Sequence, residues 1–391
     1  MLTVVVIPEE VRELARHTTA PEGLLRNPTI DALRGAAVLA VVLLHLNIRV
    51  PFASSEWGQR LPKPLSKLLF WSGYPAVIVF FVISGFLITQ NSQARWGEFR
   101  RIEIGKFYRL RFARIAPAFV LFAFVQSLLQ SARVPGFYDQ QPVASLAVTL
   151  LHAFTFRLNW LEAQLGYLPG AWDVLWSLCI EEVFYLCFPI VFRTLAVPSR
   201  ITIVLVGLAL VGPFARVSLY SNEMWADHSY LSCMGEIAIG CMAAMLAYRF
   251  RPARAQRIAL LACGVGLMSL VLYFRGLVRA IGLYRFGLDV TVLSLGSAAL
   301  ILASVRAPGA LGRGGGGGAW TSPLRWVGKH SYEIYLSHLF VVLPAALVFK
   351  RVGTPSLVPL WYGCVLLGCV LLGALIARVY SEPLTRRLRP R

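Results

Sequence analysis

The chain alternates between long apolar runs and short polar segments. Ten runs approach the length of about 20 residues that an α-helix needs to cross the hydrocarbon core of a membrane. They cover residues 30–49, 71–91, 115–132, 173–192, 201–219, 229–248, 258–274, 286–305, 331–349 and 357–378. A shorter run at 143–156 is typical of a re-entrant or interfacial segment. The pattern predicts an all-α, polytopic membrane bundle of about ten transmembrane helices.

Composition agrees with this class. Of the 391 residues, 57% are hydrophobic and 15% are charged, which leaves no room for a large soluble domain. We expect a membrane domain at 29–385, preceded by a cytoplasmic lead-in at 1–28 and followed by a basic cytoplasmic tail at 386–391. The glycine-rich loop at 312–319 is most simply a flexible tether.

The formal net charge of +19 would suggest nucleic acid in a soluble protein. Here the excess Lys and Arg lie between apolar runs, where they report topology instead, and we expect no nucleic-acid partner. If 143–156 does not span, nearly every basic cluster becomes cytoplasmic and both termini lie inside. Arg275, Arg279 and Arg285 fit this orientation poorly.

The first apolar run contains an arginine and a histidine. Each costs on the order of 2.5 to 3.5 kcal/mol in a membrane helix, so each needs a polar partner or a function. Arg34 and His45 are eleven residues apart, about three helical turns, and therefore share one face. Asp31, one turn before Arg34, is either its structural ion-pair partner or part of a polar interior.

Two later runs also have polar faces. The fourth places Trp176, Glu181 and Tyr185 near its presumed outer half, and Glu181 is either a structural hydrogen-bonding group or a participant in chemistry. The ninth run places three polar residues on one face, which forms either a polar wall or a set of substrate contacts. These residues are Ser331, Tyr335 and His338.

A basic segment follows the second run. Its cations suit either anionic lipid headgroups or a polyanionic cytosolic donor, because the arginine fork binds phosphate. The candidates are Lys106, Arg109, Arg111 and Arg114. Ser84 and Gly85 in the second run favour close helix packing. The seven cysteines show no metal-ligand spacing, so no metal is expected.

Together these segments resemble the acyltransferase-3 family of integral membrane acyltransferases. Six motifs occur in that family's order: I-D-x-L-R-G from Ile30, F-F-x-x-S-G-F-L from Phe80, R-x-x-R-I-x-P from Arg111, W-S-L-x-x-E-x-x-F-Y from Trp176, G-x-x-S-Y-x-I-Y-L-x-H from Gly328 and Y-S-E-P-L from Tyr380. Any one of them would be weak, but six in order are a strong match.

The resemblance implies transfer of an acyl group, usually acetyl, from cytosolic acyl-CoA to a hydroxyl of a sugar in a surface polysaccharide, an oligosaccharide or a glycosylated metabolite. It implies that His45 and Arg34 matter most, followed by Arg111 and Arg114 and then Glu181. It also implies a bacterial inner-membrane protein. Some members carry a fused extracytoplasmic SGNH domain. This chain ends soon after its last predicted span, so we expect either the membrane part itself or a separate protein to supply any such function.

His45 is the natural general base for a sugar hydroxyl, because a neutral imidazole can accept its proton near pH 7. Arg34 cannot act as a base and suits phosphate binding. A covalent acyl-enzyme through Ser84, Ser331 or His45 is the mechanistic rival. A secondary transporter or lipid-linked sugar flippase is the functional rival, and a different membrane-bound acyltransferase family using His and Asn is a third interpretation.

Overall fold

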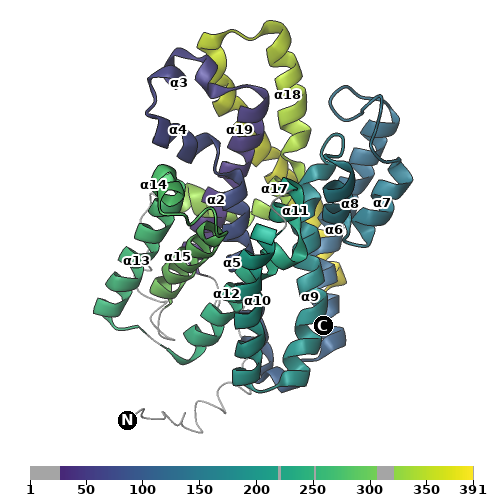
Figure 1. Ribbon diagram of the computed structural model, residues 1–391. Helices are drawn as coiled ribbons and strands as arrows, with labels where there is room; N and C mark the ends of the chain where they lie inside the picture. The colour runs from purple at the N-terminus through teal and green to yellow at the C-terminus, as the bar shows by residue number, and fades with distance from the viewer. Residues whose placement is uncertain (1–26, 219–221, 251, 306–320, 391) are drawn as a thin grey trace.

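The computed structural model describes residues 27–218, 222–250, 252–305 and 321–390 (Figure 1). The described residues form helices and turns and no β-sheet. The longer helices are α2 (Pro28–Arg49), α5 (Gly73–Trp96), α6 (Ile104–Ser131), α9 (Leu175–Leu195), α10 (Pro198–Ser218), α12 (Tyr230–Arg249), α13 (Arg254–Leu272), α15 (Leu288–Ser304), α18 (Leu339–Val352) and α19 (Val358–Ile376). The all-α prediction is confirmed.

Short elements connect and flank these helices. They are η1 (Phe52–Ser54), α3 (Glu56–Arg60), α4 (Lys63–Phe70), η2 (Phe99–Arg101), α7 (Leu146–Phe154), α8 (Leu158–Leu165), η3 (Trp172–Val174), α11 (Glu223–His228), α14 (Arg275–Ala280), α16 (Ser322–Lys329), α17 (Ser331–Ser337), η6 (Pro355–Leu357), η7 (Ala377–Ser381) and α20 (Glu382–Leu388). The predicted lead-in at 1–28 and glycine-rich loop at 312–319 fall wholly or almost wholly outside the described residues.

Each of the ten predicted spans coincides with a helical element. Within the described ranges, eight segments are long and apolar enough to cross a membrane. A ninth is the pair α17 and α18, which is bent by 44°, and the tenth predicted span is α15, which has only 17 residues. The apolar run at 143–156 contains only the nine-residue helix α7, too short to span. The protein is therefore an integral membrane protein built from a helix bundle.

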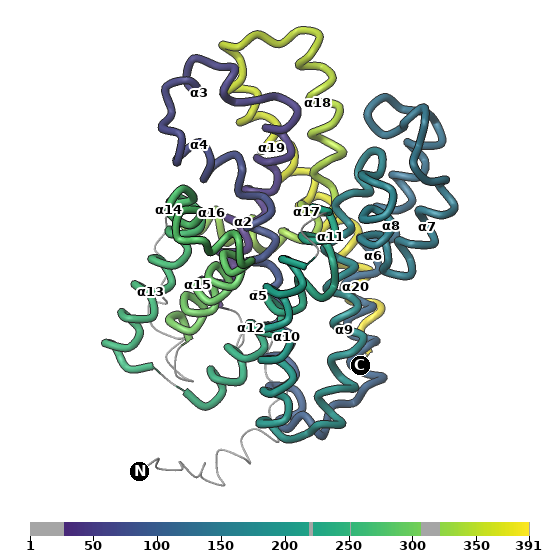
Figure 2. The backbone as a smooth tube through the Cα atoms, in the orientation of Figure 1, coloured from purple at the N-terminus to yellow at the C-terminus, as the bar shows by residue number. Residues whose placement is uncertain are grey.

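Burial separates central helices from peripheral ones. Two thirds of the apolar segments of α5, α9 and α12 are buried, against 11% for α13. The outward faces of α10, α13 and α19 carry exposed large apolar side chains, which is the arrangement that lipid contact requires. Figure 2 shows α5, α10 and α12 side by side in the middle of the view, with α13 at the edge.

Two glycine contacts fix the centre of the bundle. A Cβ on Gly85 would lie 1.9 Å from the carbonyl oxygen of Ile237, and a Cβ on Gly240 would lie 2.0 Å from that of Val82, so α5 and α12 touch backbone to backbone. Gly328 of α16 meets the carbonyl of Asp31 on α2 in the same way. These contacts fix α5 against α12 and α16 against α2.

The bend between α17 and α18 has a local cause. In an unbroken helix the carbonyl of Tyr335 would accept the N–H of Leu339. His338 occupies the break, and its Nδ1 lies 2.6 Å from the carbonyl oxygen of Tyr335. The side chain therefore takes over a backbone acceptor, one of the recognised causes of a kink.

Candidate functional site

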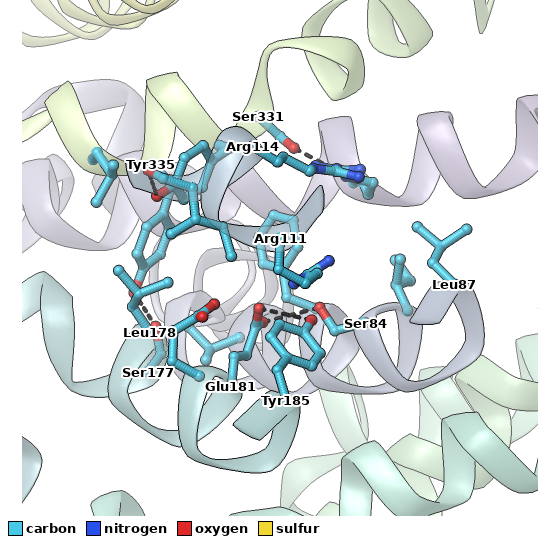
Figure 3. A pocket seen from close by; sticks show the side chains of 18 of the residues that line it. Ser84, Leu87, Arg111, Arg114, Ser177, Leu178, Glu181, Tyr185, Ser331 and Tyr335 are labelled. Atoms are coloured by element: carbon cyan, nitrogen blue, oxygen red, sulfur yellow. Dashed lines mark hydrogen bonds between the residues drawn. The ribbon is translucent and has the colours of Figure 1, made fainter. Parts of the chain in front are cut away.

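A polar cavity of about 100 Å³ lies among α2, α5, α6, α9 and α17 (Figure 3). Eight of the residues singled out in the sequence line it: Arg34, Ser84, Arg111, Arg114, Glu181, Tyr185, Ser331 and Tyr335. They come from five helices that are distant in sequence. Apolar side chains such as Val77 and Phe80 complete the wall, which is the usual composition of a small-molecule site.

Glu181 is the hub of one side of this cavity. The Ser84 hydroxyl donates to Oε1 at 3.0 Å, and the Tyr185 hydroxyl donates to Oε2 at 3.2 Å. Both carboxylate oxygens are thus oriented by hydroxyl groups from two helices. The guanidinium carbon of Arg111 lies 3.7 Å from the centre of the Tyr185 ring, so the Arg111 cation packs over the face of this tyrosine in a cation–π contact.

Arg34 connects the first helix to α17. Its Nε donates to Ser331 Oγ at 3.1 Å, while its terminal nitrogens make no hydrogen bond to the described residues. With Arg111 and Arg114 it places three guanidinium groups at one cavity. Such a set binds phosphate or other anionic groups. Asp31 lies one turn before Arg34 but is not among the described residues lining the cavity.

His45 lies outside the cavity and beside His338. The two imidazole rings have centroids 5.0 Å apart and planes inclined by 48°. His338 is buried, and because a carbonyl accepts from its Nδ1, its Nε2 carries the lone pair of the neutral ring. Among the described residues Nε2 has no hydrogen-bond partner.

The polar face of α17 bridges the two polar residues of α2. Ser331 contacts Arg34 at one end, and His338 contacts His45 at the other. Tyr335 lies between them and lines the cavity. The structure thus places Arg34 and Glu181 at one cavity and His45 outside it. The polar face of α17 and the following His338 connect the cavity with His45.

The other candidates lie at the margins. Trp176 does not line the cavity; its ring stacks on His228 at 4.0 Å between centroids. Lys106 and Arg109 lie on the first turns of α6, before the two arginines that reach the cavity.

Four polar residues of the cavity were not among the candidate site residues: Asn91, Ser177, Glu182 and Tyr332, although Ser177 and Tyr332 stand in two of the quoted motifs. Asn91 follows Ser84 by seven residues, so helical spacing could have found it. Ser177 donates to Tyr335 at 2.8 Å, since the single tyrosine hydrogen goes to the carbonyl of Val174. Only the packing of α9 against α17 reveals that pair. Glu182 Oε1 is buried without a hydrogen bond to a described residue.

No group of three or more His, Cys, Asp or Glu side chains in the described part of the chain is placed to hold a metal ion. The free polar groups of the cavity are instead guanidinium, carboxylate and hydroxyl groups. These suit anion binding and proton handling at oxygen.

Comparison with known proteins places the chain among acyltransferases. Residues 27–379 match a family model described as an acyltransferase domain. The chain is 27% identical over 344 residues to the peptidoglycan O-acetyltransferase OatA of Listeria monocytogenes, covering 81% of this chain and 49% of that protein. It is 27% identical over 351 residues to the putative peptidoglycan O-acetyltransferase YrhL of Bacillus subtilis, covering 84% of this chain and 50% of the relative.

A putative O-acetyltransferase of Staphylococcus aureus is 25% identical over 341 residues, covering 81% of this chain and 50% of the relative. The chain therefore spans about half the length of these curated relatives. No solved structure matches it.

Proposed function

Because the chain belongs to the acyltransferase domain family, we propose that it is a membrane O-acyltransferase that moves an acetyl group from cytosolic acetyl-CoA to a hydroxyl of a sugar or glycan. The names of its relatives support acetyl as the acyl group and a glycan as the acceptor. We further propose a bacterial inner-membrane location with both termini in the cytoplasm, in agreement with the distribution of basic segments.

One observation carries the proposal: α17 joins an arginine-rich cavity to a pair of histidines. In the proposed orientation Arg34, Arg111 and Arg114 face the cytoplasmic half of the bundle. Their charges suit the phosphates of a CoA donor, because guanidinium groups bind phosphate bidentately and stay charged at any working pH. Lys106 and Arg109 extend this basic surface along α6 and attract the donor to the cavity.

In the proposed reaction a neutral His45 accepts the proton of the sugar hydroxyl. The hydroxyl oxygen attacks the thioester carbonyl, the carbon–sulfur bond breaks as the tetrahedral intermediate collapses, and the leaving thiolate takes the proton from the imidazolium. His338 holds the ring of His45 from the side. Glu181 orients Ser84 and Tyr185 and balances the arginines, so that the cavity has fixed dipoles before the donor enters.

The test is release of free thiol from acetyl-CoA and from longer acyl-CoAs by the purified protein in nanodiscs, with soluble peptidoglycan fragments as acceptor. We compare wild type with His45→Ala and with His152→Ala, a matched control on the exterior helix α7. We expect release by wild type and the control, and its loss in His45→Ala. Equal activity of all three would remove His45 from the mechanism. Silence of the wild type, together with no binding of acyl-CoA, would favour a transporter.

A further inference from the structure

A second cavity of about 580 Å³ lies at the opposite end of the bundle from Arg34. It is lined by the start of α5, the end of α10, the short helices α11 and α14, and the first turn of α15. In the proposed orientation this is the outer end. The lining includes Trp71 and Tyr284, which are about half exposed, as well as charged side chains of both signs.

Two arginines build the walls of this cavity. Arg216 is buried, and its Nη1 donates to Asp227 at 3.0 Å and to the hydroxyl of Tyr74, while its Nη2 donates to the carbonyl of Ser232 at 2.7 Å. Arg275 donates from Nη2 to Ser72 Oγ at 2.8 Å and to the carbonyl of Trp71 at 3.1 Å. These guanidinium groups are committed to the protein and offer no open fork for a phosphate.

The charges that line the cavity balance. The described lining residues contribute three guanidinium groups and three carboxylates, the latter from Glu223, Asp227 and Asp289. Arg279 is the remaining cation, and its guanidinium carbon lies 5.7 Å from the centre of the Tyr284 ring. Such a surface has no net attraction for an anion. It offers hydrogen-bond donors, acceptors and aromatic faces together, which suits a neutral polyhydroxylated molecule.

The second cavity adjoins the first. Tyr74 lines the outer cavity, and Val77, one turn later on α5, lines the inner one. Between them Trp176 stacks against Tyr74 with ring centroids 6.1 Å apart, and the next residue, Ser177, lines the inner cavity. The linings of the two cavities thus come within one helical turn of each other on α5, and the stacked pair of Tyr74 and Trp176 joins α5 to α9 at this level.

We propose that the outer cavity binds a neutral segment of the glycan acceptor. The position supports this assignment, because an acceptor outside the membrane would meet the protein at this end, where the lining on α5 begins one helical turn from that of the inner cavity. The acceptor role rests on the proposed acyltransferase function, whereas glycan binding does not require turnover.

Aromatic residues also gather at membrane interfaces without binding any ligand. That tendency would account for Trp71 alone, but it does not account for three carboxylates and three arginines around the same space. Trp57 on α3 provides the matched comparison. It is 65% exposed, lies on a neighbouring outer segment and does not line the cavity.

The experiment measures equilibrium binding of tritiated chitotriose and, separately, maltotriose to the protein in nanodiscs. Wild type and Trp57→Ala should bind at least one of the two. Trp71→Ala and Asp289→Asn should weaken binding by about tenfold or more, since centrally placed aromatic and polar groups dominate such sites. Inorganic phosphate should not compete. Loss of the exposed Trp71 side chain leaves its carbonyl contact with Arg275 intact, so the variant should fold.

Equal binding by all variants, absence of binding to both sugars, or displacement by phosphate would overturn the assignment. The thiol-release assay decides the proposed function independently. If wild type binds sugar through Trp71 but releases no thiol, the glycan site is supported and the proposed acyltransferase function is refuted. If wild type releases thiol but Trp71→Ala binds sugar normally, the acyltransferase function is supported and the proposed glycan site is refuted.

Discussion

Replacing Glu181 by glutamine tests the hydrogen-bond network of the inner cavity. The substitution keeps the shape but removes the charge and one of the two acceptor oxygens. In the wild-type protein the Ser84 and Tyr185 hydroxyl groups donate to these two oxygens at 3.0 and 3.2 Å. A hydrogen bond to a charged group contributes about 1.5 to 3 kcal/mol, so losing one should lower kcat/KM by about 10- to 150-fold.

The neighbouring carboxylate supplies the control. Glu182 also lines the cavity, but its Oε1 has no hydrogen-bond partner among the described residues. Glu182→Gln should therefore change kcat/KM by less than about threefold. Tyr185→Phe, which removes one donor to Glu181, should fall between the two variants.

The assay is thiol release from acetyl-CoA in nanodiscs at saturating and limiting acceptor, with size-exclusion profiles to show that each variant is folded. The reasoning is refuted if Glu181→Gln stays within about twofold of wild type, or if Glu182→Gln loses as much activity.

Three further predictions concern packing, donor binding and pH. Gly85→Ala should lower the free energy of unfolding by about 1 to 3 kcal/mol, and the melting temperature with it, because the new Cβ would overlap a carbonyl on α12. Gly207→Ala is the control: its new Cβ would meet no atom within 4 Å, so thermal-shift assays should find this variant as stable as wild type. Ser331→Ala removes the acceptor of Arg34 Nε and should raise the KM for acetyl-CoA several-fold; an unchanged KM would detach this pair from donor binding. Burial raises the pKa of Glu162 well above its usual range, so the folded protein holds that proton more tightly than the unfolded chain and loses stability as pH rises from the unfolded to the folded pKa. Glutamine cannot ionise, so between about pH 5 and pH 8 the melting temperature of Glu162→Gln should fall less than that of wild type. If the melting temperatures of the two proteins fell in parallel over this pH range, the account would be contradicted.

The sequence could predict what depends on one helix. Apolar run lengths located the long helices that the structure describes, because lipid demands about 20 apolar residues per span. Helical spacing also placed Glu181 and Tyr185 on one face, and in the structure these side chains are hydrogen-bonded to each other. Local periodicity contains this information.

Contacts between helices could not be read from one chain. Ser84 is 97 residues from Glu181, and its hydroxyl reaches the carboxylate only because α5 and α9 meet at the cavity. The shared face of Arg34 and His45 suggested one site, yet Arg34 contacts the start of α17 and His45 contacts His338 at the break after it. The bend at His338 was equally hidden, because it depends on a side-chain contact with a carbonyl and not on a proline or glycine at the break.

The most direct measurement is transfer of radiolabelled acetyl from acetyl-CoA to soluble peptidoglycan fragments by the purified protein in nanodiscs. The account predicts that label appears in the glycan as an ester that mild alkali removes, and that His45→Ala abolishes this transfer while His152→Ala preserves it. Label that never reaches the glycan, or that reaches it equally in His45→Ala, would contradict the account.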